Sequence, residues 1–275
     1  MNSNVLIIAG MHRSGTSLVT QWLYRCGLHV GDELLGEGIG NADGHYEDLE
    51  FYELHRNILL SQNLTDDGFT EIPASEMTEE QKLKANAIIS DKSSNHGVWG
   101  WKDPRTCLFL QDYNKLIPKA KYLVVFRDFH STISSLISRT YKVMHEHDEP
   151  IDNPGFFMRY KLKRKKAREI KNLCKSEASR FLKIWILYNR EILKLIENKS
   201  RESYLVLNYE TLIHRDQEVF SQLTEAWNFS LQFVSFLNIF KPALISKNLP
   251  VDRYVNKTLY NEAYQLQEML SKMSR

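Results

Sequence analysis

A glycine loop close to the start of the chain contains the first residues whose types and spacing could do chemistry. The sequence GMHRSGTS at residues 10–17 has the glycine spacing of the phosphate-binding pattern G-x-x-x-x-G-K-[ST], and Ser17 occupies its hydroxyl position. Thr16 stands where that pattern has lysine, and Arg13 lies inside the loop. The loop therefore predicts an anion site that differs from the usual site for a nucleoside triphosphate.

Three features of this loop favour binding of an anion. Gly15 and the small residues around it let backbone N–H groups converge on one ligand, and a helix expected to begin near Ser14 adds the positive end of its dipole. Ser14, Thr16 and Ser17 add hydroxyl donors. The alternative is a plain tight turn between a strand and a helix, which would need neither Arg13 nor three hydroxyl groups.

A second candidate pair follows the most hydrophobic short segment, KYLVVF at residues 121–126. Arg127 comes directly after it, and Ser135 follows eight residues later, about two turns into the next predicted helix. An arginine at a strand end and a serine on the next helix could grip one phosphate from two sides. The alternative for Arg127 is a structural salt bridge.

Further polar residues follow two other hydrophobic segments. Lys102 and Arg105 come after VWGW at residues 98–101, and Tyr209 comes after YLVL at residues 204–207. Because the carboxyl ends of parallel strands meet at one edge of a sheet, we expect these residues to lie near the glycine loop. A single lysine at such an edge could instead be only solvated.

The elements that must position these residues alternate along the chain. Short apolar runs predict buried strands at residues 4–9, 98–101, 121–126 and 204–207, with a fifth short strand at 28–30. Helical patterns cover residues 14–26 and 47–60, and Asp103 and Asp128 are expected to cap further helices. This order predicts an α/β fold, with a parallel sheet flanked by helices on both faces as in P-loop NTPases.

Together, these segments resemble sulfotransferases that use 3′-phosphoadenosine 5′-phosphosulfate (PAPS). RSGTS at residues 13–17 is similar to that family's R-S-G-T-[ST] loop, which binds the 5′-phosphosulfate, and Arg127 with Ser135 matches its 3′-phosphate pair. WKDPRT at 101–106 and the segment 122–139 are most similar to the protein-tyrosine sulfotransferase branch and its bacterial relatives. The resemblance implies a nucleotide-binding transferase with PAPS as donor, 3′,5′-ADP as product, no metal, and Tyr209 near the nucleotide.

The reaction implied by this resemblance is in-line transfer of a sulfuryl group to an acceptor hydroxyl or amine. It requires positive charge on the transferring group, for which Lys102 and Arg13 are the candidates. It also requires a base, and the resemblance favours Glu47, at the expected start of the helix over residues 47–60. His45 is the second candidate and Glu33 the third. Glu47 could alternatively be only a favourable charge at a helix N-terminus.

Length and composition suit a single domain over residues 1–275, with a basic helical insertion at about 144–176. Within it, RYKLKRKKAR at residues 159–168 could form a lid or a site for an acidic acceptor, or only a solvated helix face. His145 and His147 have a spacing that could suit a metal, but no third ligand is evident. A carbohydrate, a peptide or a small molecule could each be the acceptor.

Two other function classes compete with the transferase. A P-loop kinase or NTPase is disfavoured because the loop lysine is missing and no strand ends in a convincing Walker-B aspartate. A nucleic-acid-binding protein is disfavoured by the net charge of only +2 and by the lack of a recognised motif. Three scattered cysteines and no apolar run of membrane-spanning length lead us to expect a cytoplasmic protein.

Overall fold

The computed structural model describes residues 3–36, 44–149, 155–242 and 247–274. Its centre is a parallel four-stranded sheet in the order β2-β1-β3-β4. The strands are β1 (Asn4–Ala9), β2 (Val98–Lys102), β3 (Lys121–Phe126) and β4 (Tyr204–Asn208). All four predicted runs at these positions are therefore strands. In the register of the sheet, Leu6 of β1 pairs with Gly100 of β2 and Lys121 of β3.

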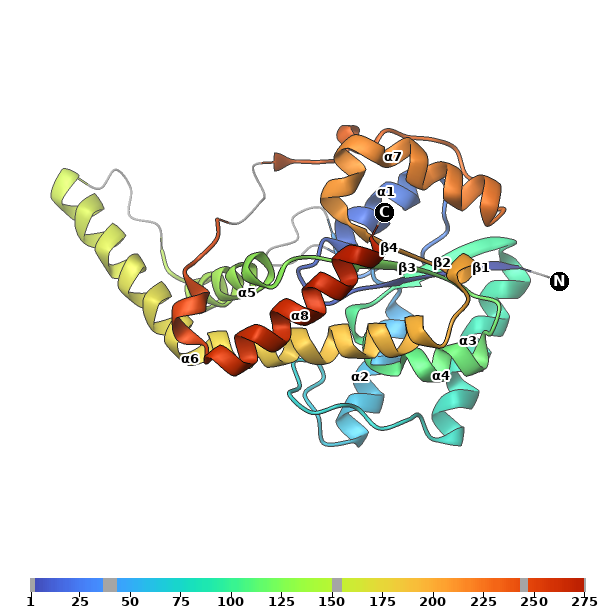
Figure 1. Ribbon diagram of the computed structural model, residues 1–275, viewed down its shortest axis with the longest axis horizontal. Coiled ribbons are helices and arrows are strands. Elements are labelled where there is room, and N and C mark those ends of the chain that lie inside the picture. The colour runs from blue at the N-terminus through green and yellow to red at the C-terminus, as the bar shows by residue number, and fades with distance from the viewer. Residues whose placement is uncertain (1–2, 37–43, 150–154, 243–246, 275) are drawn as a thin grey trace.

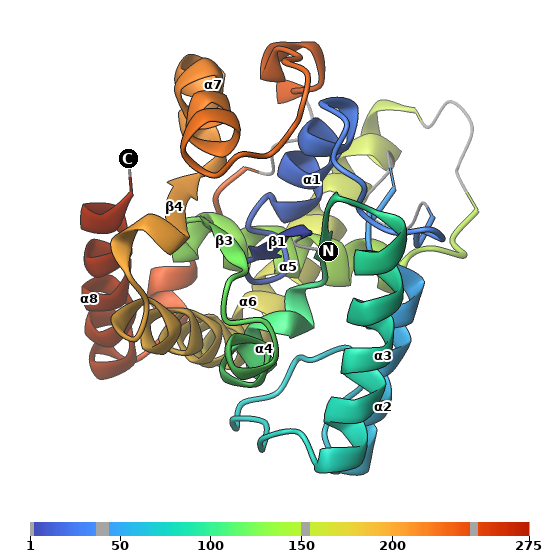
Figure 2. The same cartoon turned by 90° about the vertical axis from the view of Figure 1, so that its right-hand side faces the viewer.

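Helices cover both faces of this sheet, which confirms the predicted fold class (Figures 1 and 2). On one face, α1 and α7 pack against the side chains of Leu6 and Ile8. On the other face, α2, α4, α5, α6 and α8 pack against Val5 and Ile7. The helices are α1 (Thr16–Arg25), α2 (Leu49–Ser61), α3 (Glu79–Asn95), α4 (Leu110–Leu116), α5 (Phe129–Met144), α6 (Phe156–Glu197), α7 (Leu212–Ser221) and α8 (Lys257–Met273).

Shorter helical segments connect these elements. Asp103 caps the first of them by accepting a hydrogen bond from the Arg105 N–H, and Asp128 caps α5 by accepting one from the Ser131 N–H, both as predicted. The 3-10 helices are η1 (Pro104–Phe109), η2 (Arg201–Ser203), η3 (Tyr209–Thr211), η5 (Phe236–Asn238) and η7 (Val251–Tyr254), and η4 (Gln222–Ala226) is a π-helical turn.

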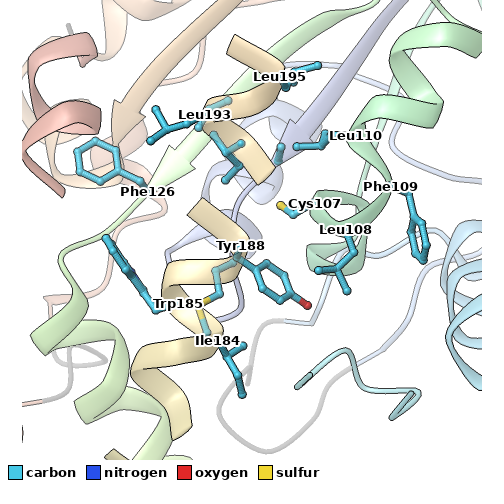
Figure 3. Packing of buried hydrophobic residues seen from close by; sticks show 14 of the residues in the cluster. Cys107, Leu108, Phe109, Leu110, Phe126, Ile184, Trp185, Tyr188, Leu193 and Leu195 are labelled. Carbon is cyan, nitrogen blue, oxygen red and sulfur yellow. The ribbon is translucent and has the colours of Figure 1, made fainter. Parts of the chain in front are cut away.

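The larger of the two hydrophobic clusters in the core lies between the sheet and α6. Trp185 and Tyr188 of α6 are fully buried there, beside Cys107 and Leu108 of η1 (Figure 3). Each large apolar side chain buried in this way contributes roughly 1.5–3 kcal/mol. The Trp185 indole N–H also donates to the Arg127 carbonyl at 3.2 Å. Packing of α6 therefore fixes the end of β3, where the predicted anion site begins.

The helix α6 extends well beyond this core. It is one continuous helix of 42 residues, and its first part projects from the body in Figure 1. Residues 156–168 are exposed on all sides, and they include the basic segment 159–168. Among the helices that the structure describes, none combines the length and the apolar composition that crossing a bilayer requires. The predicted insertion at 144–176 stays a prediction, and part of it lies outside the described residues.

Three predicted element boundaries need correction. Residues 28–30 do not form a strand: only His29 makes a β-bridge, to Trp99, because the chain turns away at Gly31. The first helix begins at Thr16, two residues later than expected, because Gly15 is left-handed with a φ of 93°. Glu47 does not start a helix, since Asp48 is the N-cap of α2.

Candidate active site

A cavity of about 790 Å³ opens at the carboxyl ends of the strands, where the sequence predicted the site. The loop after β1, the segment before α2, the ends of β3 and β4, and α5 all contribute to its wall. Most of the predicted site residues line it, namely Arg13, Gly15, Thr16, Ser17, His45, Glu47, Arg127 and Tyr209. Ser14, Lys102 and Ser135 are buried just behind this wall.

The glycine loop follows β1 and leads directly into α1. Gly15 has a φ of 93°, and a Cβ atom there would lie 2.7 Å from the Tyr209 ring. Only glycine suits this position, because both the backbone conformation and the close ring exclude a side chain. The loop thus directs the N-terminus of α1, the positive end of its dipole, to the cavity.

A lysine from β2 reaches the glycine loop. Lys102 is almost fully buried, and its Nζ donates to the Ser17 hydroxyl at 3.2 Å and to Glu47 Oε1 at 2.7 Å. Arg105 reaches the other oxygen of the same carboxylate, with Nη2 3.5 Å from Glu47 Oε2. These contacts place the predicted cation, the glycine loop and the predicted base in one group.

The three candidate bases differ in their surroundings. Glu47 is buried and held by two cations, as described above. His45 lies beside it, with Nδ1 4.0 Å from Glu47 Oε1. Burial of the His45 ring, and next the nearby Lys102, lower its pKa to about 4, so the imidazole is neutral at pH 7. Glu33 is exposed and does not line the cavity, so the geometry disfavours it.

Arg127 and Ser135 lie together with the glycine loop. Arg13 donates from Nε to the Ser135 hydroxyl at 3.1 Å, and Arg127 donates from Nη1 to the Arg13 carbonyl at 3.4 Å. The Arg127 guanidinium also lies 5.6 Å from the centre of the Tyr209 ring. Residues that follow β1, β3 and β4 therefore converge with a residue of α5.

The Arg127 guanidinium lacks the salt bridge that the structural alternative requires. Within the described part of the chain it makes no ion pair with a carboxylate, and its buried Nε has no hydrogen-bond partner. Only 8% of Arg127 is exposed. A buried cation without a counter-charge is strongly unfavourable, so this arrangement favours an anionic ligand beside it.

The cavity wall includes cationic and aromatic residues that the sequence did not single out as site residues. Arg139 of α5 lines it, and burial, Arg139 and Arg127 together lower the pKa of Arg13 to about 10. His12 also lines it, with its ring stacked on Phe69 at 4.7 Å between ring centres. The spacing of Arg139 to Ser135, one helical turn on α5, could have indicated that both lie on the same face of that helix.

The structure gives different surroundings to His145 and His147, whose spacing could suit a metal. His145 contacts Asp148 through Nδ1 and Glu169 through Nε2, and it is only partly exposed. His147 is exposed, as expected for a loop residue. The imidazole of His145 therefore has carboxylate partners on both nitrogens.

Comparison with known proteins identifies the architecture. No protein-family profile and no curated protein matches the sequence. Among solved structures, the sulfotransferase domain of the olefin synthase from Synechococcus PCC 7002 superposes with a TM-score of 0.52 and 19% identity, over 98% of this chain and 95% of that domain. The chain has a sulfotransferase fold. This confirms the fold that the motifs predicted.

Two further solved structures are similar to this chain at lower scores. The sulfotransferase domain from the curacin biosynthetic pathway has a TM-score of 0.48 and 15% identity, and covers 98% of each chain. A sulfotransferase from Mycobacterium tuberculosis has a TM-score of 0.48 and 10% identity, over 96% of this chain and 77% of that one. The predicted likeness to the protein-tyrosine sulfotransferase branch stays a prediction.

Proposed function

We propose that this protein is a PAPS-dependent sulfotransferase that transfers a sulfuryl group to an acceptor hydroxyl or amine. The observation that carries the proposal is Arg127, a buried guanidinium without a carboxylate partner in the described chain, next to Arg13 and Ser135. The sulfotransferase fold supports it at the level of architecture. Residues 1–275 then form one catalytic domain.

The donor would bind through two groups of residues. The loop amides with Arg13, Ser14, Thr16 and Ser17 would hold the 5′-phosphosulfate, because amides and hydroxyl groups at a helix N-terminus favour oxyanions. Gly15 lets Tyr209 pack against this loop.

The second group would hold the 3′-phosphate. Arg127 and Ser135 would bind it from the end of β3 and from α5, and Tyr209 would flank the nucleotide beside Arg127. A phosphate there would supply the counter-charge that the guanidinium lacks.

In the transfer step, the acceptor oxygen or nitrogen forms a bond to sulfur while the bond from sulfur to the 5′-phosphate oxygen breaks. The electron pair of that bond goes to the phosphate oxygen, and the acceptor proton goes to Glu47. Lys102 and Arg13 stabilise the negative charge that develops on the oxygens. Lys102 Nζ is 3.2 Å from the Ser17 hydroxyl and 2.7 Å from Glu47 Oε1. It could therefore contact both the transferring group at the loop and the base.

The proposed chemistry needs no metal ion. Thr16 stands in the place of the loop lysine, and Lys102 from β2 supplies the cation instead. Asp103, the carboxylate after β2, is not free to hold Mg²⁺ because it accepts hydrogen bonds from Arg105 and contacts His55. We therefore expect EDTA to leave turnover largely intact, and an absolute Mg²⁺ requirement would favour a kinase or NTPase.

Thermal melting with two nucleotides tests the proposal. 3′,5′-ADP should stabilise the wild-type protein, while 5′-AMP should do so far less because it lacks the 3′-phosphate. A micromolar ligand at millimolar concentration contributes roughly 4 kcal/mol. Arg127→Ala should remove most of the difference between the two nucleotides. Arg56→Ala is the matched control, because Arg56 lines the same cavity but is paired with Asp66.

Equal stabilisation by both nucleotides would contradict the assignment of the 3′-phosphate site. If the nucleotide result holds, labelled PAPS with a set of carbohydrates, peptides and small metabolites would identify the acceptor. The outer cavity wall includes the aromatic residues Tyr52, Phe69 and Phe181, so acceptors with an apolar portion should be included.

A further inference from the structure

The first part of α6 presents both apolar and cationic side chains to solvent. We call residues 156–168 the arm. The arm projects from the body of the protein in Figure 1, and every residue in it is exposed. It lies wholly within the described residues, and none of it lines the active-site cavity. Its surface chemistry is therefore separate from that of the cavity.

Large apolar side chains gather at the free end of the arm. Phe156 and Phe157 are 81% and 85% exposed, and their ring centres lie 5.8 Å apart. Met158, Tyr160 and Leu162 are also exposed. Neighbouring apolar side chains that stay in water are unfavourable, and a soluble protein usually exposes such a patch where something else covers it.

Positive charge surrounds the arm behind these apolar residues. Residues 159–168 include seven lysines and arginines and no aspartate or glutamate, whereas the whole chain has a net charge of only +2. The rest of the chain is therefore net negative. Successive residues of a helix turn by about 100°, so these seven side chains point to all sides of the axis. The arm is thus complementary to an extended anionic surface.

The order of these groups along the arm favours a lipid bilayer over a protein partner. A helix that docks in a protein groove presents an apolar stripe along one face. In the arm, the most exposed apolar residues instead form one end, and cations follow on every side. A bilayer has the same order with depth, because phosphate headgroups lie outside the acyl chains. Aromatic rings and long basic side chains both suit that boundary.

The base of the arm is held against the folded body. Lys166 Nζ lies 5.3 Å from the centre of the Tyr141 ring on α5. Glu169, directly after the arm, has its Oε2 3.2 Å from Nε2 of His145, the C-cap residue of α5. Contact of the tip with a surface would therefore hold the whole domain at that surface.

We propose that the arm docks this protein on a bilayer that contains anionic lipids. Phe156, Phe157 and Met158 would enter the boundary between headgroups and acyl chains, and the cations behind them would contact lipid phosphates. The apolar tip is far shorter than the roughly 20 residues needed to cross a bilayer, so the contact would be peripheral. The proposal does not depend on the proposed function.

Cosedimentation of the full-length protein with lipid vesicles tests this surface. The protein should bind vesicles of phosphatidylcholine with about one third phosphatidylglycerol, and not vesicles of phosphatidylcholine alone. Phe156→Ser and Phe157→Ser together should weaken binding at least about tenfold, because the burial of two phenyl rings is lost. Ile72→Ser with Leu83→Ser is the matched control, since these residues are 61% and 68% exposed but lie outside the arm. Its binding should equal that of the wild type.

The charge of the arm is tested with a second pair of variants. Four of its cations are changed together to glutamine, namely Lys163, Arg164, Lys165 and Lys166. This change should weaken vesicle binding at least about tenfold, since each cation near an anionic membrane contributes to attraction. The control changes four exposed lysines further along α6, namely Lys171, Lys175, Lys183 and Lys194. Binding by the control should be much less affected, because these lysines lie further from the tip than a Debye length.

Hydrogen exchange of the wild type gives a readout that does not depend on variants. Anionic vesicles should slow exchange of the amides at 158–168, and neutral vesicles should not. Circular dichroism shows whether each variant is folded.

Three results would overturn the inference. The first is a wild-type protein that does not bind anionic vesicles. The second is unchanged binding by the folded phenylalanine variant, because the contact would then be only electrostatic and open to any polyanion, RNA included. The third is self-association of the wild type without lipid that the phenylalanine variant abolishes, because a second copy of the chain would then cover the tip.

Discussion

At the scale of single residues, the cavity combines many positive charges with one buried carboxylate. Five cationic side chains surround its inner wall, namely Arg13, Lys102, Arg105, Arg127 and Arg139. Glu47 contacts Lys102 and Arg105, whereas Arg13, Arg127 and Arg139 form a second group of cations at the cavity. Such an excess of charge in a partly desolvated cavity favours a dianionic or trianionic ligand.

Replacement of the proposed base should impair transfer and spare nucleotide binding. General-base catalysis typically contributes 10²–10⁴-fold, or about 3–5 kcal/mol of barrier. Glu47→Gln should therefore lower kcat by that factor for a hydroxyl acceptor, with little change in the affinity for 3′,5′-ADP. Steady-state kinetics and nucleotide titration of the same preparation measure both quantities.

The neighbouring histidine provides the control for this prediction. His45→Ala should leave most of the activity, because the Glu47 carboxylate remains in place between Lys102 and Arg105. If Glu47→Gln instead keeps near wild-type kcat while His45→Ala loses it, the base is His45. Glu47 would then serve only to hold the two cations.

His12 should make the folded state sensitive to acid. Burial of the His12 ring lowers its pKa from 6.5 to about 3, and the charge of the nearby Arg105 is the second cause. Between these two pH values, the unfolded state therefore binds a proton that the native state does not bind. Stability is therefore lost as pH falls from 6.5 towards 3, at up to about 1.4 kcal/mol per pH unit. Between pH 7 and pH 5 the wild type should lose about 2 kcal/mol more than His12→Gln, measured by urea unfolding. Equal losses in both proteins would contradict this prediction.

At the scale of elements, the turn between β1 and α1 should tolerate no side chain at Gly15. Gly15→Ala forces a left-handed alanine, which costs roughly 1–2 kcal/mol, and also a contact of 2.7 Å with the Tyr209 ring. Gly27→Ala is the matched control, because Gly27 has a φ of 99° and nothing within 4 Å of its Cβ position. Urea unfolding should show a larger loss for Gly15→Ala, and equal losses would mean that the ring moves away freely.

The basic part of α6 should affect the acceptor rather than the donor. Lys166, near the end of this part, lies beside α5, because its Nζ is 5.3 Å from the centre of the Tyr141 ring. The C-terminal end of α5 in turn lines the cavity. If this part guides an anionic acceptor, its neutralisation should raise KM for such an acceptor and leave the affinity for 3′,5′-ADP nearly unchanged. The residues to be changed together are Lys163, Arg164, Lys165 and Lys166.

A second set of charges on the same helix controls for a general effect of charge. Exposed lysines along the rest of α6 offer an equal number of positions, namely Lys171, Lys175, Lys183 and Lys194. Their neutralisation should leave KM for the acceptor unchanged. An unaltered KM in the first variant as well would mean that residues 159–168 form only a solvated helix face in the lipid-free protein.

At the scale of the whole molecule, local sequence patterns were enough to predict the sheet and the residues at its edge. The four strands are continuous apolar runs buried on both faces, and a buried parallel strand cannot easily take another pattern. Arg127 and Ser135 could be paired because Ser135 lies on α5, about two helical turns after Arg127. Candidate site residues then followed from a general rule about strand ends.

Contacts between distant segments could not be predicted in this way. The hydrogen bond from Arg13 to Ser135 joins residues 122 positions apart, and the stacked rings of His29 and His96 join the segment after α1 to the segment after α3. Helix α3 was not predicted because it buries only Ala85, Ile89 and Lys92, of which two are apolar. Such features depend on packing, which the periodicity of one segment does not encode.

The last prediction concerns the unequal stability of one continuous helix. Residues 156–168 of α6 are exposed on all sides, whereas Trp185, Tyr188 and Ile192 further along are fully buried. An isolated helical stretch of this length is marginal in water, so its amides should open with a free energy near zero. The buried half shares the stability of the whole domain, typically 5–15 kcal/mol.

Hydrogen exchange followed by mass spectrometry should therefore divide α6 in two. In the dilute protein, we expect amides at 158–168 to exchange less than about tenfold more slowly than those of a free peptide. Protection of at least 10³-fold at these residues would require another segment or molecule to cover them. Amides at 184–195 should be protected by at least 10³-fold under the same conditions. If both halves are equally slow, and the protection of the first half falls on dilution, a second molecule covers the exposed arm. Equal protection at every concentration would show that the projecting helix packs against its own chain.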